Sequence, residues 1–193
     1  MESITLDKVT LEIIQDESPD NPREWDNLGT MACWHNRYTL GEPHNYATPH
    51  DFTQEINERT AVILPLYLFD HSGLTISTTS TLFHACDPAG WDWGQIGYIY
   101  VPRETVRKEY GVKHITRRMI DRVAELLRGE VETYNQYMQG DVYGFVLNDR
   151  QTGETIDSCW GFFGADPICN GMADQFPAEY RDDILAHYYQ RAA

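Results

Sequence analysis

The apolar side chains between residues 115 and 138 recur at three- and four-residue steps, and this pattern constrains the fold more than any other. A period of 3.6 residues places them on one face of a helix. They are Ile115, Met119, Ile120, Val123, Leu126, Leu127, Val131, Tyr134 and Met138. The polar positions carry arginine and acidic residues at spacings that form local pairs. We therefore predict one long amphipathic helix that buries a single face and ends at Gly140.

Apolar and alternating segments on both sides of this helix are typical of strands joined in hairpins. Residues 61–70 (AVILPLYLFD) are nearly all apolar, and residues 74–79 return after a turn, although Pro65 implies a bulge or an edge. Other strands are expected at residues 3–14 with a bulge near Asp7 and Lys8, 31–40, 97–101, 141–149 and 154–163, and further helices at 51–59, capped by Asp51, and from about Ala178. The pattern predicts an α+β fold: a mainly antiparallel sheet of hairpins, the long helix packed across one face, and a C-terminal helix.

The length and composition of the chain suggest one compact, intracellular protein. With 193 residues, 41% of them hydrophobic, it is expected to form a single acidic α+β domain over residues 1–193 around one core. No run approaches the roughly 18 apolar residues of a membrane span, and residues 1–14 lack the pattern of a secretory signal. The cysteines, which form no CxxC pair, are Cys33, Cys86, Cys159 and Cys169. We therefore expect a cytoplasmic protein with reduced thiols.

The 30 acidic and 15 basic side chains are unevenly distributed, and the net charge is -15. Residues 1–30 carry 8 acids and 2 bases, residues 131–193 carry 10 and 3, and residues 103–130 carry 5 and 8. Such a charge repels phosphate backbones and anionic membranes, so neither is an expected partner. A folded acidic surface can instead present carboxylates where a basic groove expects phosphates, although acidity for solubility alone is the competing interpretation. The candidate partner-binding residues are Asp16, Glu17, Asp20, Glu24, Asp26, Asp174, Glu179, Asp182 and Asp183.

One set of residues could support nucleophilic catalysis. Asp70, His71 and Cys159 supply the orienting acid, the base and the thiol of a cysteine hydrolase. Cys159 falls within a predicted strand, however, and residues 70–73 are also good turn chemistry. A structural role for these residues is therefore the favoured interpretation.

Ligand and metal sites are weighed in the same way. Trp91 and Trp93 flank an aspartate, as in some sugar- or peptide-binding clefts, but tryptophans this close together also close the end of a sheet. No glycine-rich phosphate loop is present, and no cofactor is expected. Four residues of zinc-ligand type match no standard spacing, so no metal is expected: Cys33, His35, His44 and His50.

Six segments together resemble a known family. They are DNPREWDNLGTM (20–31), LPLYLFDHSG (64–73), WDWGQIGYIYV (91–101), VRKEYG (106–111), GEVETYNQYMQGDVYGFV (129–146) and DSCWGFFG (157–164). Over most of its length the chain resembles an uncharacterised family of short acidic proteins encoded by bacteriophages, plasmids and other mobile elements. The resemblance supplies no catalytic residues. It implies a setting in which small acidic proteins often inhibit host defences such as restriction or CRISPR nucleases.

Charge and resemblance lead to one functional prediction and one alternative. We expect a non-enzymatic counter-defence inhibitor, of the anti-restriction or anti-CRISPR type, that binds a host nucleic-acid-handling protein complex through an acidic, DNA-mimicking surface. The alternative is a small enzyme or ligand-binding module, either a thiol hydrolase or a binder of a small signalling molecule, centred on Asp70, His71 and Cys159. Tyr188 and Tyr189 on the last helix suit either a homodimer or internal packing.

Overall fold

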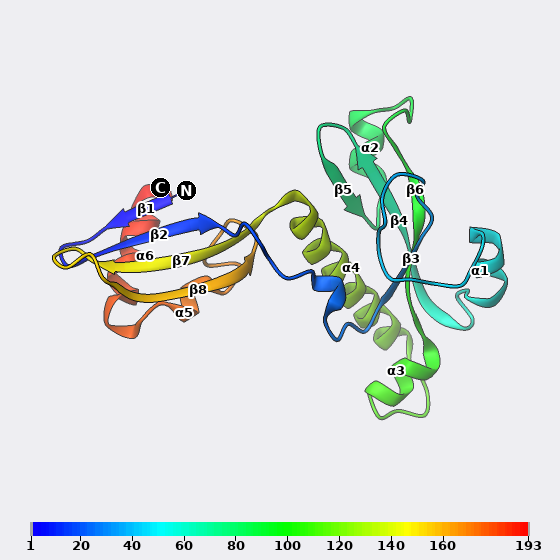
Figure 1. The fold of residues 1–193 in the computed structure, drawn as a ribbon. Coiled ribbons are helices and arrows are strands. Elements are labelled where there is room, and N and C mark those ends of the chain that lie inside the picture. Colours follow the sequence, from blue (N-terminus) through cyan, green and yellow to red (C-terminus); the bar gives the residue numbers. More distant parts are fainter. Residues whose placement is uncertain (1, 193) are drawn as a thin grey trace. The chain divides into compact units, whose positions relative to one another are not determined.

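The computed structural model describes residues 2–192 and divides the chain into two compact units, each built on its own sheet (Figure 1). The terminal unit combines Met1–Asp20 with Gly140–Ala193, and the central unit is Asn21–Gln139. Both sheets are four-stranded and antiparallel, so the predicted α+β class is confirmed. The single core expected over residues 1–193 is not observed, because the first strands pair with those after the long helix and form a second core there.

The central sheet has the strand order β3 (Thr30–Cys33), β6 (Trp93–Pro102), β4 (Ala61–Asp70) and β5 (Leu74–Ser77). β4 coincides with the apolar segment that was predicted as a strand. Pro65, which has no N–H, pairs only on the β6 side, since β5 opposes only residues 67–70. The register between β4 and β6 shifts between Leu66 and Tyr67. Of the two alternatives predicted for Pro65, the edge position is therefore confirmed, and the bulge lies after Leu66 and not at the proline.

The long helix predicted over residues 115–138 is α4 (Arg117–Gln139), which packs against one face of the central sheet (Figure 1). Val123, Leu127 and Val131 recur every four residues and are almost fully buried in the same cluster as Ile99 of β6. Leu126, which the pattern also places on the apolar face, is 40% exposed. The buried stripe is therefore narrower than predicted. Within residues 2–192, the helices are all too short or too polar to cross a membrane.

The other face of the central sheet is covered by α1 (Pro49–Glu55). Its Phe52 is fully buried and contacts the rings of Tyr98 and Tyr100 on β6. The helix begins after Thr48 and not after Asp51 as predicted. The Thr48 hydroxyl accepts a hydrogen bond from the Asp51 N–H, and the Asp51 carboxylate accepts one from the Thr48 N–H. This capping box satisfies backbone donors at the helix start.

Short elements account for most of the remaining differences from the sequence prediction. The strand predicted at residues 31–40 ends at Cys33, where the chain leaves the sheet. The short helices without a predicted counterpart are η1 (Pro22–Glu24), α2 (Thr81–Cys86), α3 (Arg103–Glu109) and α5 (Met172–Gln175). Helices of one or two turns carry too little periodicity to be distinguished from loops.

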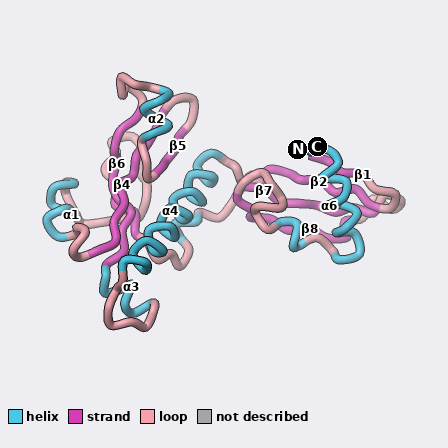
Figure 2. Tube along the Cα trace, turned by 180° about the vertical axis from the view of Figure 1, so that it is seen from behind, coloured by secondary structure: helices cyan, strands magenta, loops and turns pink. Residues whose placement is uncertain are grey.

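The terminal sheet has the strand order β1 (Glu2–Thr5), β2 (Val9–Gln15), β7 (Val142–Asp149) and β8 (Thr155–Phe163). The single bulged strand predicted at residues 3–14 is wrong, because residues 6–8 form a turn that makes β1 and β2 a hairpin. One face is covered by α5 (Met172–Gln175) and α6 (Ala178–Ala192), the helix predicted from Ala178 (Figure 2). Phe145, Phe176 and Ile184 are buried there.

The opposite face of the terminal sheet carries the indole of Trp160. Gly144 and Phe145 are neighbours on β7 and therefore face opposite sides of the sheet. The Trp160 ring occupies the space above Gly144, where an added Cβ atom would collide with it, and Trp160 is 46% exposed. Of the two tyrosines considered for a dimer, Tyr188 packs against the terminal core and Tyr189 is exposed.

Candidate functional site

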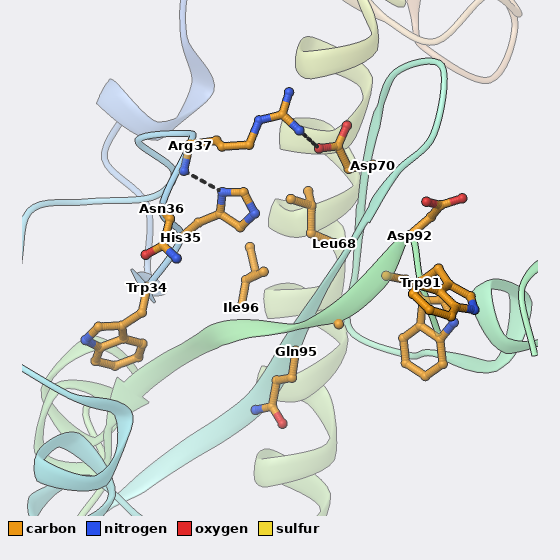
Figure 3. A pocket seen from close by; sticks show the side chains of 12 residues that line it. Trp34, His35, Asn36, Arg37, Leu68, Asp70, Trp91, Asp92, Gln95 and Ile96 are labelled. Carbon is orange, nitrogen blue, oxygen red and sulfur yellow. Dashed lines mark hydrogen bonds and ion pairs between the residues drawn. The ribbon is translucent and has the colours of Figure 1, made fainter. Parts of the chain in front are cut away.

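A hollow of about 480 Å³ lies at one end of the central sheet (Figure 3). Antiparallel pairing brings the ends of β3 and β4 next to the start of β6, since Cys33 pairs with Gly97 and Phe69 pairs with Trp93. The lining residues are Trp34, His35, Asn36, Arg37, Leu68, Asp70, Trp91, Asp92, Trp93, Gly94, Gln95 and Ile96. Four residues singled out from the sequence, His35, Asp70, Trp91 and Trp93, therefore share one site.

The loop of residues 87–93 holds two tryptophans at the rim of this hollow. The Asp87 carboxylate accepts hydrogen bonds from the backbone N–H groups of Asp92 (2.9 Å) and Ala89 (3.2 Å), and such bonds lower the pKa of Asp87. Trp93 Nε1 donates to the Asp87 carbonyl oxygen at 2.8 Å, which anchors that indole. Trp91 is 87% exposed. A braced loop thus presents one anchored indole and one exposed indole.

Two carboxylates lie at the rim, and each contacts a nitrogen-bearing side chain. The Asp70 carboxylate accepts hydrogen bonds from the Arg37 guanidinium at 3.0 Å and from the Tyr38 hydroxyl at 3.3 Å. The same guanidinium lies over the Tyr38 ring, 5.1 Å from its centroid. His71 Nδ1 lies 2.8 Å from a carboxylate oxygen of Asp92. The rim can therefore offer carboxylate oxygens and aromatic faces to a ligand.

The residues proposed for a thiol hydrolase are not paired as the sequence suggested. The carboxylate next to His71 belongs to Asp92 and not to Asp70. Cys159 lies on β8 of the terminal unit, where it packs at the margin of the hydrophobic core. The hydrolase hypothesis required a contact between Asp70 and His71, and the structure instead pairs His71 with Asp92.

The thiol of Cys33 is largely buried, which disfavours its reactive thiolate form. Burial, and secondly the charge of Glu42, raise its pKa to about 12, so the thiol stays protonated at neutral pH. The backbone carbonyl oxygen of Cys33 lies 3.0 Å from Nε2 of His44. Among residues 2–192, no three or more His, Cys, Asp or Glu side chains are grouped in a way that could hold a metal ion. Cys33 and the three histidines near it in the sequence are therefore not grouped as metal ligands in the described structure.

The terminal unit holds most of the excess negative charge. Its 74 residues contain 15 acidic and 4 basic side chains, a formal charge of -11. The central unit contains 15 acidic and 11 basic side chains in 119 residues, a formal charge of -4. Of the nine candidate partner-binding residues, Glu24 and Asp26 belong to the central unit and the other seven to the terminal unit. The charge is therefore concentrated in one unit.

Three of these seven residues, Asp16, Glu17 and Asp20, follow the last residue of β2. The Asp16 N–H donates to the Val142 carbonyl oxygen at 2.8 Å, which ties this segment to the start of β7. The Asp16 carboxylate accepts a hydrogen bond from the Ser18 N–H at 3.0 Å. This acidic group is thus held at the end of the sheet where β2 finishes.

A second acidic group forms at the opposite end of the sheet, where the two hairpins turn. Asp7 and Asp183 line one shallow hollow. Burial, the charge of Glu179 and then the charge of Asp149 raise the pKa of Tyr180. Both carboxylates therefore lie near this tyrosine. The other predicted members near α6, Asp174 and Asp182, are exposed. The sequence did not single out Asp7 and Asp149, because Asp7 lies in a short turn and Asp149 ends a strand, and both are far from α6 along the chain.

Comparison of the chain with protein-family models, with curated proteins and with solved structures finds no match.

Proposed function

We propose that the chain is a non-enzymatic counter-defence inhibitor that binds a host nucleic-acid-handling protein complex in the bacterial cytoplasm through an acidic, DNA-mimicking surface. The observation that carries this proposal is the formal charge of -11 on the 74 residues of the terminal unit. The partner that fits such a unit is a basic groove that ordinarily holds nucleic acid, as in restriction or CRISPR nucleases. The resemblance to short acidic proteins of bacteriophages and plasmids supports the same setting.

Long-range attraction is the main contribution of these carboxylates. Exposed charges act over roughly 10 Å at 0.1 M salt, so they steer a basic partner toward the terminal unit and raise the association rate. The same charges repel nucleic acid and a second copy of the unit. Binding should therefore weaken steeply as salt rises, and DNA should compete for the same groove.

Affinity beyond steering requires apolar contact, and the face of the terminal sheet with Trp160 offers it. The indole is partly exposed above Gly144. Glu12 lies on this face, because it is two residues from Ile14, the register partner of Gly144. Tryptophan is enriched among the residues that dominate interface energies. Trp160 is therefore the apolar anchor that we assign to the basic partner.

Inhibition of purified nucleases tests the proposal. Plasmid cleavage by a panel of restriction and RNA-guided nucleases is measured with increasing amounts of the full chain. We expect at least one nuclease to lose activity, duplex DNA added first to protect it, and the inhibition to fade between about 0.05 and 0.3 M salt. If every nuclease in the panel keeps its normal rate at the lowest salt, the proposal is wrong.

A further inference from the structure

The hollow at the end of the central sheet has a chemistry different from that of the acidic terminal unit (Figure 3). Its rim combines the exposed indole of Trp91 with the carboxylates of Asp70 and Asp92. The loop that carries Trp91 is held by three hydrogen bonds that involve Asp87. The Trp91 indole is therefore exposed on a loop that hydrogen bonds hold in place.

The rim already holds one cation of its own. The Arg37 guanidinium donates to Asp70 at 3.0 Å and lies over the ring of Tyr38. A carboxylate beside an aromatic ring is an arrangement that holds cationic side chains. Further along the rim, Asp92 and Trp91 supply the same two components, and the present partner of Asp92 is the exposed His71.

We propose that the hollow binds an arginine side chain of a protein partner, with the guanidinium stacked on Trp91 and hydrogen-bonded to Asp92. Anionic ligands are disfavoured by the two carboxylates of the rim. A sugar can also stack on an indole, but it is neutral and gains no ionic hydrogen bond from the rim carboxylates of Asp70 and Asp92. A basic groove presents arginines, so the inference deepens the proposed function and depends on it for the class of partner.

Peptide binding tests the site directly. The probe is a pentapeptide with one central arginine flanked by glycine and serine, and its control carries citrulline, the neutral isostere of arginine. The indole N–H signals of the five tryptophans are followed by two-dimensional NMR. We expect the Trp91 and Trp93 signals to shift saturably with the arginine peptide and far less with the citrulline peptide. Trp91→Ala should weaken binding about fivefold and Asp92→Asn about tenfold.

Two control variants separate this site from other surfaces. Trp25→Ala removes an exposed indole outside the hollow and should leave the affinity unchanged. Neutralisation of four terminal-unit acids should also leave it unchanged, so the site can be confirmed even where no nuclease is inhibited: Asp174→Asn, Glu179→Gln, Asp182→Asn and Asp183→Asn. Equal responses to both peptides, or full affinity in both Trp91→Ala and Asp92→Asn, would overturn the inference. A saturable response to monosaccharides but not to the arginine peptide would overturn it as well.

Discussion

Replacement of Arg23 by methionine should destabilise the central unit strongly, because this buried side chain joins three segments through ionic hydrogen bonds. Arg23 is 7% exposed. Its guanidinium donates to Glu130 of α4 at 3.1 Å, to the Gly29 carbonyl oxygen at 2.7 Å and to Glu42 at 2.9 Å. Both carboxylates also accept backbone hydrogen bonds, Glu130 from Gly29 at 3.1 Å and Glu42 from Met31 at 2.6 Å.

The magnitude follows from the two carboxylates that lose their cation. Removing one partner of a buried ion pair costs about 3–5 kcal/mol. The side chain of Glu42 is 25% exposed and that of Glu130 is 11% exposed. After the substitution both carboxylates still accept hydrogen bonds from backbone N–H groups. We therefore expect a loss near the lower limit, about 3 kcal/mol. With a urea dependence of about 2 kcal/mol per molar, the unfolding midpoint should fall by about 1.5 M.

Urea unfolding followed by tryptophan fluorescence measures this loss. Four of the five tryptophans belong to the central unit, and Trp160→Phe removes the other. In that background, Arg23→Met is compared with a triple variant that adds Glu42→Gln and Glu130→Gln. The triple variant removes the unpaired charges and should recover at least half of the loss. A loss below about 1 kcal/mol, as for a surface pair, or a triple variant no more stable than Arg23→Met, would refute the reasoning.

Two further predictions concern the same unit. Its free energy of unfolding should fall as pH rises above about 9, because the unfolded chain releases the Cys33 proton near 9.0 whereas the folded state holds it to about 12. The slope is at most about 1.4 kcal/mol per pH unit, and a Cys33→Ala variant that keeps the same slope in urea titrations would contradict this origin. Gly97→Ala should cost about 1–3 kcal/mol because a Cβ atom there would lie 2.9 Å from Cα of Cys33 on β3. Gly94→Ala on the same strand meets open space, so equal melting temperatures for the two variants would disprove the packing argument.

Local elements could be predicted wherever one periodicity persists over a long segment. α4 and β4 follow their predicted ranges closely, because each has a single burial pattern over ten residues or more. The hairpin of β1 and β2 was not predicted, because its two strands share one burial pattern and read as a single strand. Ile4, Val9 and Leu11 all face one core, so the turn between them resembles a slip within one strand.

The two units and the hollow could not be predicted, because both depend on pairing between distant segments. β2 pairs with β7 across the whole of the central unit, and no local pattern specifies that partner. The hollow likewise draws on segments that follow β3, end β4 and begin β6. The sequence singled out Asp70 and the segment Trp91-Asp92-Trp93, whereas Arg37 was missed because only the sheet register brings it to the same rim.

Inhibition should depend on where the negative charge lies and not on its total, and two matched variants separate these quantities. One neutralises four exposed acids of the terminal unit: Asp174→Asn, Glu179→Gln, Asp182→Asn and Asp183→Asn. The other neutralises four exposed acids of the central unit: Glu58→Gln, Glu104→Gln, Glu109→Gln and Glu132→Gln. Each raises the net charge from -15 to -11.

The decisive measurement is the inhibition constant of each variant against a nuclease that the natural chain inhibits, at low salt. A terminal-unit surface predicts a loss of at least about tenfold for the first variant, or about 1.4 kcal/mol, and less than about twofold for the second. Equal losses in the two variants would show that the chain acts through diffuse charge and not through one acidic unit.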